Sequence, residues 1–230
     1  DLAVAKGIDA RRIAVVNPGA SLPAPIDTGS RLEFRRRHAV HFDRYLVFTG
    51  RMTKRKGLSV FLQHILPLII QREPGIGLVV VGGAPQDSLN QLGEQAEIQQ
   101  QISAQCLHNS VTFLGNLSDR DLEICYAEAT LQILPLIEVP GDVEGFGMVA
   151  IEAAASGTPT VAFELGGVAD AISAGNGCLV APGEFSMFAD KVVNILRNGG
   201  PTAEHCAAHA RQFTWQIYNE RMRALIERPR

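Results

Sequence analysis

Short apolar runs and longer amphipathic stretches alternate along almost the whole chain. Runs rich in Val, Ile, Leu and Phe predict strands, and apolar positions at helical spacing between these runs predict helices. The predicted strands are 12–16, 44–50, 77–83, 111–115, 131–136, 159–164 and 177–180. The predicted helices are 57–72, 86–106, 119–129, 147–156 and 185–197, with two more after Pro201.

This alternation is typical of α/β units on a parallel sheet. The strand segments are almost continuously apolar, as a sheet covered on both faces requires. We therefore expect a single domain over residues 1–230 with a Rossmann-like, doubly wound parallel sheet. Ser118 predicts a helix N-cap, and Gly157 predicts a helix end. The basic run 35–38 is expected to be a solvated loop or a helix face.

Composition excludes several classes of protein. The chain of 230 residues is 46% hydrophobic, which is enough to build a large core, and its net charge of -3 gives no general affinity for nucleic acid or an anionic membrane. The four cysteines lack Cys-x-x-Cys spacing, and no apolar run is long enough to span a bilayer. We expect a soluble, cytoplasmic protein. Because the chain begins at Asp1 without a signal peptide, we also expect it to be part of a longer protein.

A cluster of cations follows the predicted strand 44–50. Ligands of open α/β sheets bind beyond the carboxyl ends of the strands, so this loop is a candidate site. Its cations are Arg51, Lys54, Arg55 and Lys56. A guanidinium and an ammonium beside a helix N-terminus suit a phosphate group, although a solvated surface loop has the same composition.

A glycine-rich loop before a predicted buried helix carries two glutamates. Gly145, Phe146 and Gly147 let the backbone approach a ligand, and the helix start offers free N–H groups and a positive dipole end. Side chains tilt toward a helix N-terminus, so Glu152 is expected to reach the cleft from which Glu144 projects. Each carboxylate could form a structural salt bridge or accept from sugar or ribose hydroxyls.

Two other interpretations are weaker. The segment 145–150 matches Gly-x-Gly-x-x-Ala of dinucleotide sites, but the acid-containing residues 137–144 separate it from the preceding strand and would repel a pyrophosphate. His205 and His209 have metal-ligand spacing without a third ligand nearby. Asp119 and Asp121 form an Asp-x-Asp pair that could suggest a metal site. They stand, however, where a helix N-terminus favours acids, so we assign them no metal. We predict neither a metal nor a cofactor.

Seven features in this order resemble a known family. They are Gly50-Arg51, Lys56-Gly57, VVVGG, VTFLGNL, Glu144 and Glu152 with seven residues between them, SGTPTVAFELGG, and GCLVAP. The set resembles the C-terminal, donor-binding half of retaining glycosyltransferases of GT-B fold, of the group 1 or family 4 type, which include sucrose and glycogen synthases. The resemblance covers nearly all of residues 5–225. NPGAS (17–21) and Asp170 depart from the family pattern, which blurs the subfamily.

The resemblance implies roles for individual residues. Arg51 and Lys56 would bind the donor diphosphate and stabilise the leaving nucleotide. Glu144 would hold donor sugar hydroxyls and complete the catalytic set, Glu152 would accept from the ribose, and the backbone of Leu117 would meet the base. The other donor-binding residues implied are Gly145, Phe146, Gly147, Met148 and Val149, the last three through backbone N–H groups.

It also implies a function. Such a protein moves a hexose from a nucleotide diphosphate sugar, with UDP or GDP, to an acceptor hydroxyl, with retention and without a metal. The acceptor site would lie on a missing N-terminal domain, from which residues 1–11 would enter and toward which a terminal helix at 213–228 would pack. That domain could also contact a membrane surface. We expect the fragment to be inactive alone; alternatives are a GT-B epimerase or phosphorylase, or a non-catalytic nucleotide-binding module.

Overall fold

A computed structural model describes residues 2–83 and 91–227. Six strands form one sheet in the order β3-β2-β1-β4-β5-β6, and every neighbouring pair is parallel. The strands are β1 (Arg44–Thr49), β2 (Ile76–Val81), β3 (Val111–Gly115), β4 (Leu131–Leu134), β5 (Thr160–Phe163) and β6 (Gly177–Val180). The predicted doubly wound, Rossmann-like parallel sheet is confirmed.

Helices precede, connect and follow the strands. They are α1 (Leu2–Ala5), α2 (Thr28–Arg37), α3 (Leu58–Val60), α4 (Leu66–Arg72), α5 (Gln91–Ala104), α6 (Asp119–Glu128), α7 (Met148–Ala155), α8 (Phe185–Asn198), α9 (Ala203–Ala210) and α10 (Trp215–Ile226). The predicted helix 57–72 is divided by a π-helical turn, Phe61–Ile65. Part of the predicted helix 86–106 lies outside the described residues. None of the helices described is both long and apolar enough to cross a membrane.

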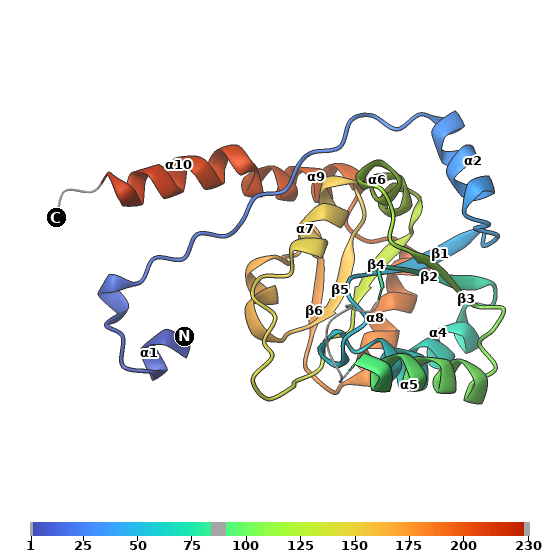
Figure 1. Cartoon of the computed structure of the whole chain (residues 1–230). Coiled ribbons are helices and arrows are strands. Elements are labelled where there is room, and N and C mark those ends of the chain that lie inside the picture. The colour runs from blue at the N-terminus through green and yellow to red at the C-terminus, as the bar shows by residue number, and fades with distance from the viewer. Residues whose placement is uncertain (1, 84–90, 228–230) are drawn as a thin grey trace.

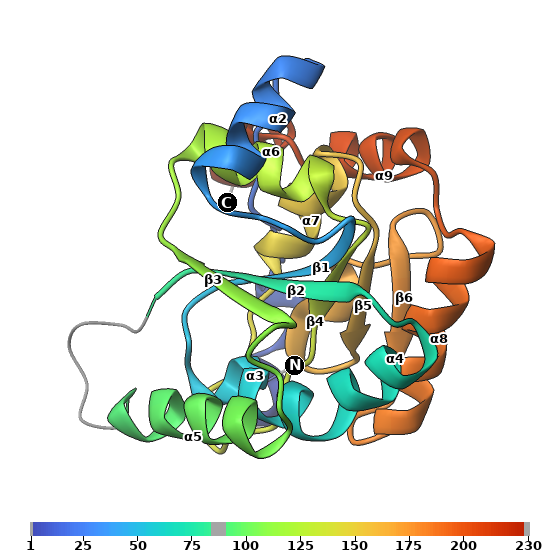
Figure 2. The same cartoon turned by 90° about the vertical axis from the view of Figure 1, so that its right-hand side faces the viewer.

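Side chains alternate across the strands and build a core on each face of the sheet. In β1, Leu46 and Phe48 point to one face, while Tyr45 and Val47 point to the other. Helices α3, α4, α5 and α8 cover the first face, and α2, α6, α7 and α9 cover the second (Figure 2). Burying each large apolar side chain contributes about 1.5–3 kcal/mol, so both faces stabilise the sheet.

Helix α2 was not predicted, because it carries little apolar surface. Phe34 is its one buried residue among those described. The helix is held instead by charge, since Arg31 and Arg35 both donate to the Glu128 carboxylate of α6, at 2.8 and 2.5 Å. The basic run therefore lies on a helix face, as one of the two expectations had it, and Arg35 is only partly exposed.

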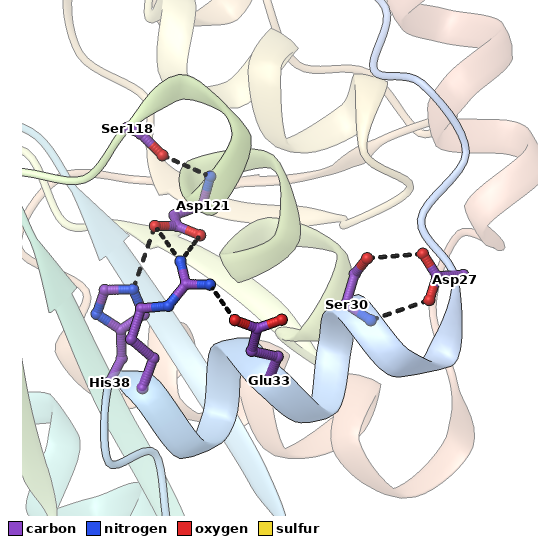
Figure 3. Close-up of polar contacts among 7 residues, drawn as sticks. Asp27, Ser30, Glu33, His38, Ser118 and Asp121 are labelled. Atoms are coloured by element: carbon purple, nitrogen blue, oxygen red, sulfur yellow. Dashed lines mark hydrogen bonds and ion pairs between the residues drawn. The ribbon is translucent and has the colours of Figure 1, made fainter.

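Further polar contacts join α2 to the start of α6 (Figure 3). Arg37 donates to the Asp121 carboxylate at 3.2 Å, and His38 approaches the same carboxylate. Ser118 accepts from the backbone N–H of Asp121 at 3.1 Å, so the predicted N-cap is confirmed. Asp121 thus has a structural role at the helix N-terminus, where an acid is favourable.

The two ends of the chain extend from the sheet (Figure 1). The strand predicted at 12–16 is wrong: residues 13–16 are irregular and Val15 is 75% exposed. An apolar run becomes a strand only where a sheet edge receives its backbone, and none does so here. Ala20 is the first residue of this segment to pair, through a 2.6 Å hydrogen bond from its N–H to the carbonyl of Phe213 before α10.

The strand order reverses between β1 and β4, and the loops that follow these two strands pack against each other. Gly57 makes this contact possible. Its φ is +69°, and a Cβ atom there would lie 1.9 Å from the carbonyl oxygen of Pro135. Nearby, the N–H of Ile137 donates to the carbonyl of Arg55 at 3.0 Å. The close approach fixes both walls of the crevice at the switch point, where open α/β sheets bind ligands.

A glycine substitution tests this packing. Gly57→Ala is expected to destabilise the fold by several kcal/mol, because the added methyl group collides with backbone as well as straining φ. Gly75→Ala is the matched control: Gly75 has φ +88° but open space around its Cβ position, so it should cost only about 1–2 kcal/mol. Urea unfolding of both variants measures the difference, and equal costs would contradict the close packing.

Candidate functional site

Two adjoining pockets lie at the carboxyl ends of the strands. The Lys56 pocket, about 460 Å³, is lined by Lys56, Glu144 and residues 145–149, with residues 15–18 of the N-terminal segment. The Glu152 pocket, also about 460 Å³, is lined by Arg51, Leu117, Tyr126 and Glu152 among others. Val149 lines both, so the two pockets lie side by side, and together they are called the cleft. Each is large enough for part of a small-molecule ligand.

Glu144 is shared by two cations. The Lys56 ammonium donates to Glu144 Oε2 at 2.6 Å, and the Arg55 guanidinium bonds to the same oxygen. Arg55 also donates to Asp142 at 2.7 Å. Lys56 and Arg55 are each only 8% exposed, so they do not form a solvated loop, and Lys56 lines the pocket. The salt bridge considered for Glu144 is therefore present.

The electrostatics of Glu144 follow from these contacts. Burial by itself would raise the pKa of the Glu144 carboxyl, but the hydrogen bond and charge of Lys56, reinforced by Arg55, outweigh burial and lower it. The carboxylate thus stays ionised well into the acidic range. The Glu144 carboxylate neutralises part of the positive charge of Lys56 and Arg55. These three residues, the Glu144 cluster, can therefore place two cations side by side at the edge of a ligand pocket.

The start of α7 lies at the Lys56 pocket. Gly147 adopts a left-handed conformation, φ +84°, and no side chain caps the helix. Its first residues, Met148 and Val149, line the pocket. The loop before the helix is held in place because the N–H of Gly167 donates to the carbonyl of Glu144 at 2.9 Å. Free N–H groups, a helix dipole and the Lys56 ammonium together form an arrangement that can bind an anion.

Glu152 has a different environment. Tyr126 donates to Glu152 Oε2 at 3.3 Å, and in the described part of the chain the carboxylate forms no ion pair. Burial raises the pKa of Glu152, since taking a charged carboxylate out of water is unfavourable, and the Tyr126 hydrogen bond offsets this only in part. A half-buried carboxylate without a cation is suited to accept hydrogen bonds from ligand hydroxyls.

The structure brings the predicted site residues into this one cleft. Lys56, Glu144, Gly145, Phe146, Gly147, Met148 and Val149 line the Lys56 pocket, and Arg51, Leu117, Val149 and Glu152 line the Glu152 pocket. Arg51 is exposed at its rim, whereas Lys56 is buried. Within the described residues there is no group of three or more His, Cys, Asp or Glu side chains that could hold a metal ion.

Some residues of the cleft were missed. Arg55 is one of four cations in the loop, and spacing alone does not tell which cation turns inward. Asn17, the first residue of the NPGAS motif that departs from the family pattern, lines the Lys56 pocket from the N-terminal segment. Thr49 and Tyr126 line the Glu152 pocket and bond to each other at 2.8 Å. A polar residue in an apolar strand, such as Thr49, is the signal that could have found them.

Comparison with known proteins identifies the family. The model of the glycosyl transferases group 1 family matches residues 43–198, which is more than half of the chain. The chain belongs to the group 1 glycosyltransferases, as the motifs suggested. It is 32% identical, over 96% of its length, to the D-inositol 3-phosphate glycosyltransferases of Mycobacterium tuberculosis and Mycobacterium bovis. It spans only 45% of the length of these curated relatives.

Solved structures show the same fold. HepE of Anabaena, crystallised with UDP and glucose, aligns with a TM-score of 0.81 at 24% identity, over 97% of this chain and 59% of that one. Sucrose-phosphate synthase of Thermosynechococcus elongatus aligns with a TM-score of 0.72 at 26% identity, over 92% of this chain and 50% of that one. The chain thus corresponds to part of each of these larger proteins.

The Glu144 cluster predicts a pH-dependent stability. Because the folded-state pKa of Glu144 is lowered, its carboxylate stabilises the fold above its unfolded pKa of about 4.3, and this contribution is lost as the pH falls through the folded pKa. Glu144→Gln should therefore cost about 1.5–3 kcal/mol at pH 7 and progressively less below pH 4.3.

Urea unfolding between pH 7 and pH 3 measures this difference. Glu138→Gln, which changes an exposed glutamate of the same loop, is the control and should behave like the wild type. A cost for Glu144→Gln that does not change with pH would show that the carboxylate charge is not what stabilises the cluster.

Proposed function

We propose that this chain is the donor-binding half of a glycosyltransferase and holds a nucleotide diphosphate sugar in the cleft that the two pockets form. The observation that carries the proposal is that the buried Lys56 ammonium and the uncapped start of α7 line one pocket, while Arg51 and Glu152 line the pocket beside it. Membership of the group 1 family and the alignment with larger glycosyltransferases support it.

The diphosphate would lie in the Lys56 pocket. Lysine has three N–H donors, and the bond to Glu144 uses one of them, so two remain for phosphate oxygens. The N–H groups of Gly147, Met148 and Val149 add the helix end, and Arg51 closes the site from the rim. When the nucleoside diphosphate leaves the anomeric carbon, negative charge grows on the phosphate, and these preorganised groups stabilise that charge.

The two glutamates would bind opposite ends of the donor. Arg55 and Lys56 both donate to Oε2 of Glu144, which leaves Oε1 to accept from donor sugar hydroxyls. Glu152 would accept from the ribose. Leu117 lines the same pocket as Glu152, and its backbone would meet the base. Neither glutamate acts as a general base in this scheme, so the chain supplies binding and charge stabilisation.

The remainder of the enzyme would supply the acceptor site. The chain spans less than half of its curated relatives, and both of its ends extend from the sheet, with Trp215 of α10 49% exposed (Figure 1). We propose that residues 1–11 and α10 pack against a preceding domain that binds the acceptor and could also contact a membrane surface. Retention of configuration, a soluble cytoplasmic location and the absence of a metal requirement are expected from the family.

Uridine nucleotides are the first donors to test, because HepE, which has the same fold, was crystallised with UDP and with UDP-glucose. Titration calorimetry with UDP, GDP and ADP should show binding of at least one of them to the 230-residue chain. Lys56→Ala should weaken that binding about 10- to 100-fold, which corresponds to the loss of about 1.5–3 kcal/mol for a hydrogen bond to a charged group.

Lys54→Ala is the matched control for this titration. Lys54 precedes Arg55 and Lys56 in the same turn but is exposed, so its removal should leave the affinity unchanged. Thermal unfolding of both variants establishes that they are folded. Equal affinities of wild type and Lys56→Ala, or equal losses in the two variants, would overturn the assignment of Lys56 to the diphosphate.

The purified chain should transfer no sugar. Donor sugar, an alcohol acceptor and the 230-residue chain are expected to release nucleoside diphosphate no faster than buffer, because the acceptor would not be held near the anomeric carbon. Release of nucleoside diphosphate is measured by a coupled assay. Efficient acceptor-dependent turnover by this chain alone would contradict the proposal that a second domain is needed.

A further inference from the structure

We propose that Tyr126 is a positioning residue for Glu152 and that a buried chain of polar side chains makes Tyr126 an obligatory hydrogen-bond donor to this carboxylate. The proposal deepens the proposed function, on which it rests. It explains how the site would discriminate a ribose from a sugar that lacks the 2′ and 3′ hydroxyls. The chain consists of Thr160, Gln132 and Thr49, one residue from each of three neighbouring strands.

The three residues lie on the face of the sheet covered by α6 and α7. Gln132 of β4 pairs with Thr160 of β5 in the sheet register, and its other neighbour, Val47 of β1, is two residues before Thr49. Thr160 and Gln132 are fully buried, and Thr49 is 4% exposed. Polar groups at such depth are unfavourable unless they are hydrogen-bonded, so their presence in three apolar strands needs an explanation.

The contacts form one continuous path. Thr160 Oγ1 donates to Gln132 Oε1 at 2.8 Å, and Gln132 Nε2 donates to Thr49 Oγ1 at 3.0 Å. Thr49 Oγ1 lies 2.8 Å from Tyr126 Oη, which in turn lies 3.3 Å from Glu152 Oε2. A bond from Thr158 Oγ1 to the carbonyl of Tyr126, at 2.5 Å, holds the end of α6 in place.

The direction of every bond follows from the last acceptor. An ionised Glu152 can only accept, so Tyr126 must give its single proton to it and must accept from Thr49. Thr49 then has no proton left for Gln132 and accepts from the amide. Such a chain polarises each successive donor, which strengthens the final bond. Burial, with the nearby Glu152 charge adding to it, raises the pKa of Tyr126, so its hydroxyl keeps its proton.

The consequence concerns the ligand. Tyr126 donates to Oε2 of Glu152, which restricts the rotation of the carboxylate and leaves the other oxygen, Oε1, to accept from a ligand in the pocket that Glu152 lines. A fixed acceptor binds the ribose hydroxyls without a loss of side-chain freedom. Without the tyrosine hydroxyl, the carboxylate can turn away, and the preference for a ribose over a sugar lacking its 2′ and 3′ hydroxyls should fall.

The test compares the ribose form and the dideoxy form of each nucleotide in each variant. Calorimetry measures the affinities of UDP, GDP and ADP, each beside its 2′,3′-dideoxy form, for the wild type, Tyr126→Phe and Tyr45→Phe. Tyr45 is the matched control because it is also fully buried and donates to a carbonyl, that of Cys125, at 2.7 Å. The wild type and Tyr45→Phe should prefer the ribose form at least about tenfold, as expected for a hydrogen bond to a charged group.

Tyr126→Phe should lose most of this preference, to about threefold or less, while its affinity for the dideoxy form stays that of the wild type. Thr49→Val, which removes the donor to Tyr126 with little change in shape, should lower the preference in the same direction and serves as the second variant if Tyr126→Phe does not fold. A purely structural role would weaken both nucleotides equally.

The outcomes separate this inference from the proposed function. If the wild type binds no nucleoside diphosphate, the proposed function fails and the inference with it. If the wild type binds with a clear preference for ribose and Tyr126→Phe keeps that preference in full, the inference alone is overturned. If Tyr45→Phe loses the preference as well, the effect is not specific to the chain that ends on Glu152, and the inference is again overturned.

Discussion

The cleft depends on one carboxylate, that of Glu144, which Lys56 and Arg55 hold from the opposite side of the switch point. Lys56 and Arg55 belong to the loop after β1, whereas Glu144 belongs to the loop between β4 and α7. The shared ion pair therefore ties together the two segments from which the walls of the Lys56 pocket are built. Its cost in desolvation is offset because two cations satisfy one carboxylate and Asp142 binds the second cation.

The sheet places this interaction where it can serve a ligand. Parallel strands deliver their following loops to one edge, and the reversal of strand order between β1 and β4 leaves a crevice there. The close contact of Gly57 with Pro135 and the left-handed Gly147 allow backbone to line the crevice. The result is a buried ammonium and a helix N-terminus facing one cavity, with a second, carboxylate-bearing cavity beside it.

Much of this arrangement could be predicted from sequence. Six of the seven predicted strands are present, and their residues are mostly apolar, which is a strong local signal. The exception, 12–16, has the same apolar character but no sheet edge to join, which no local pattern reveals. Helix α2 was not predicted because it lacks an apolar stripe. Ion pairs with Glu128 hold it in place instead.

In the cleft, residue types were predictable but partnerships were not. Spacing identified Lys56, Glu144 and Glu152 as candidates, yet it could not show that Arg55 joins Lys56 on one carboxylate, because adjacent cations look alike in sequence. The contact between Tyr126 and Glu152 depends on how α6 and α7 pack over the sheet, which is a tertiary property.

A crystal structure of this chain with a bound nucleoside diphosphate tests the account most directly. We expect the pyrophosphate within hydrogen-bonding distance of Lys56 Nζ and of the N–H groups that begin α7, with the ribose hydroxyls on Glu152. A diphosphate bound elsewhere, with Lys56 contacting only Glu144 and the start of α7 facing solvent, would contradict it.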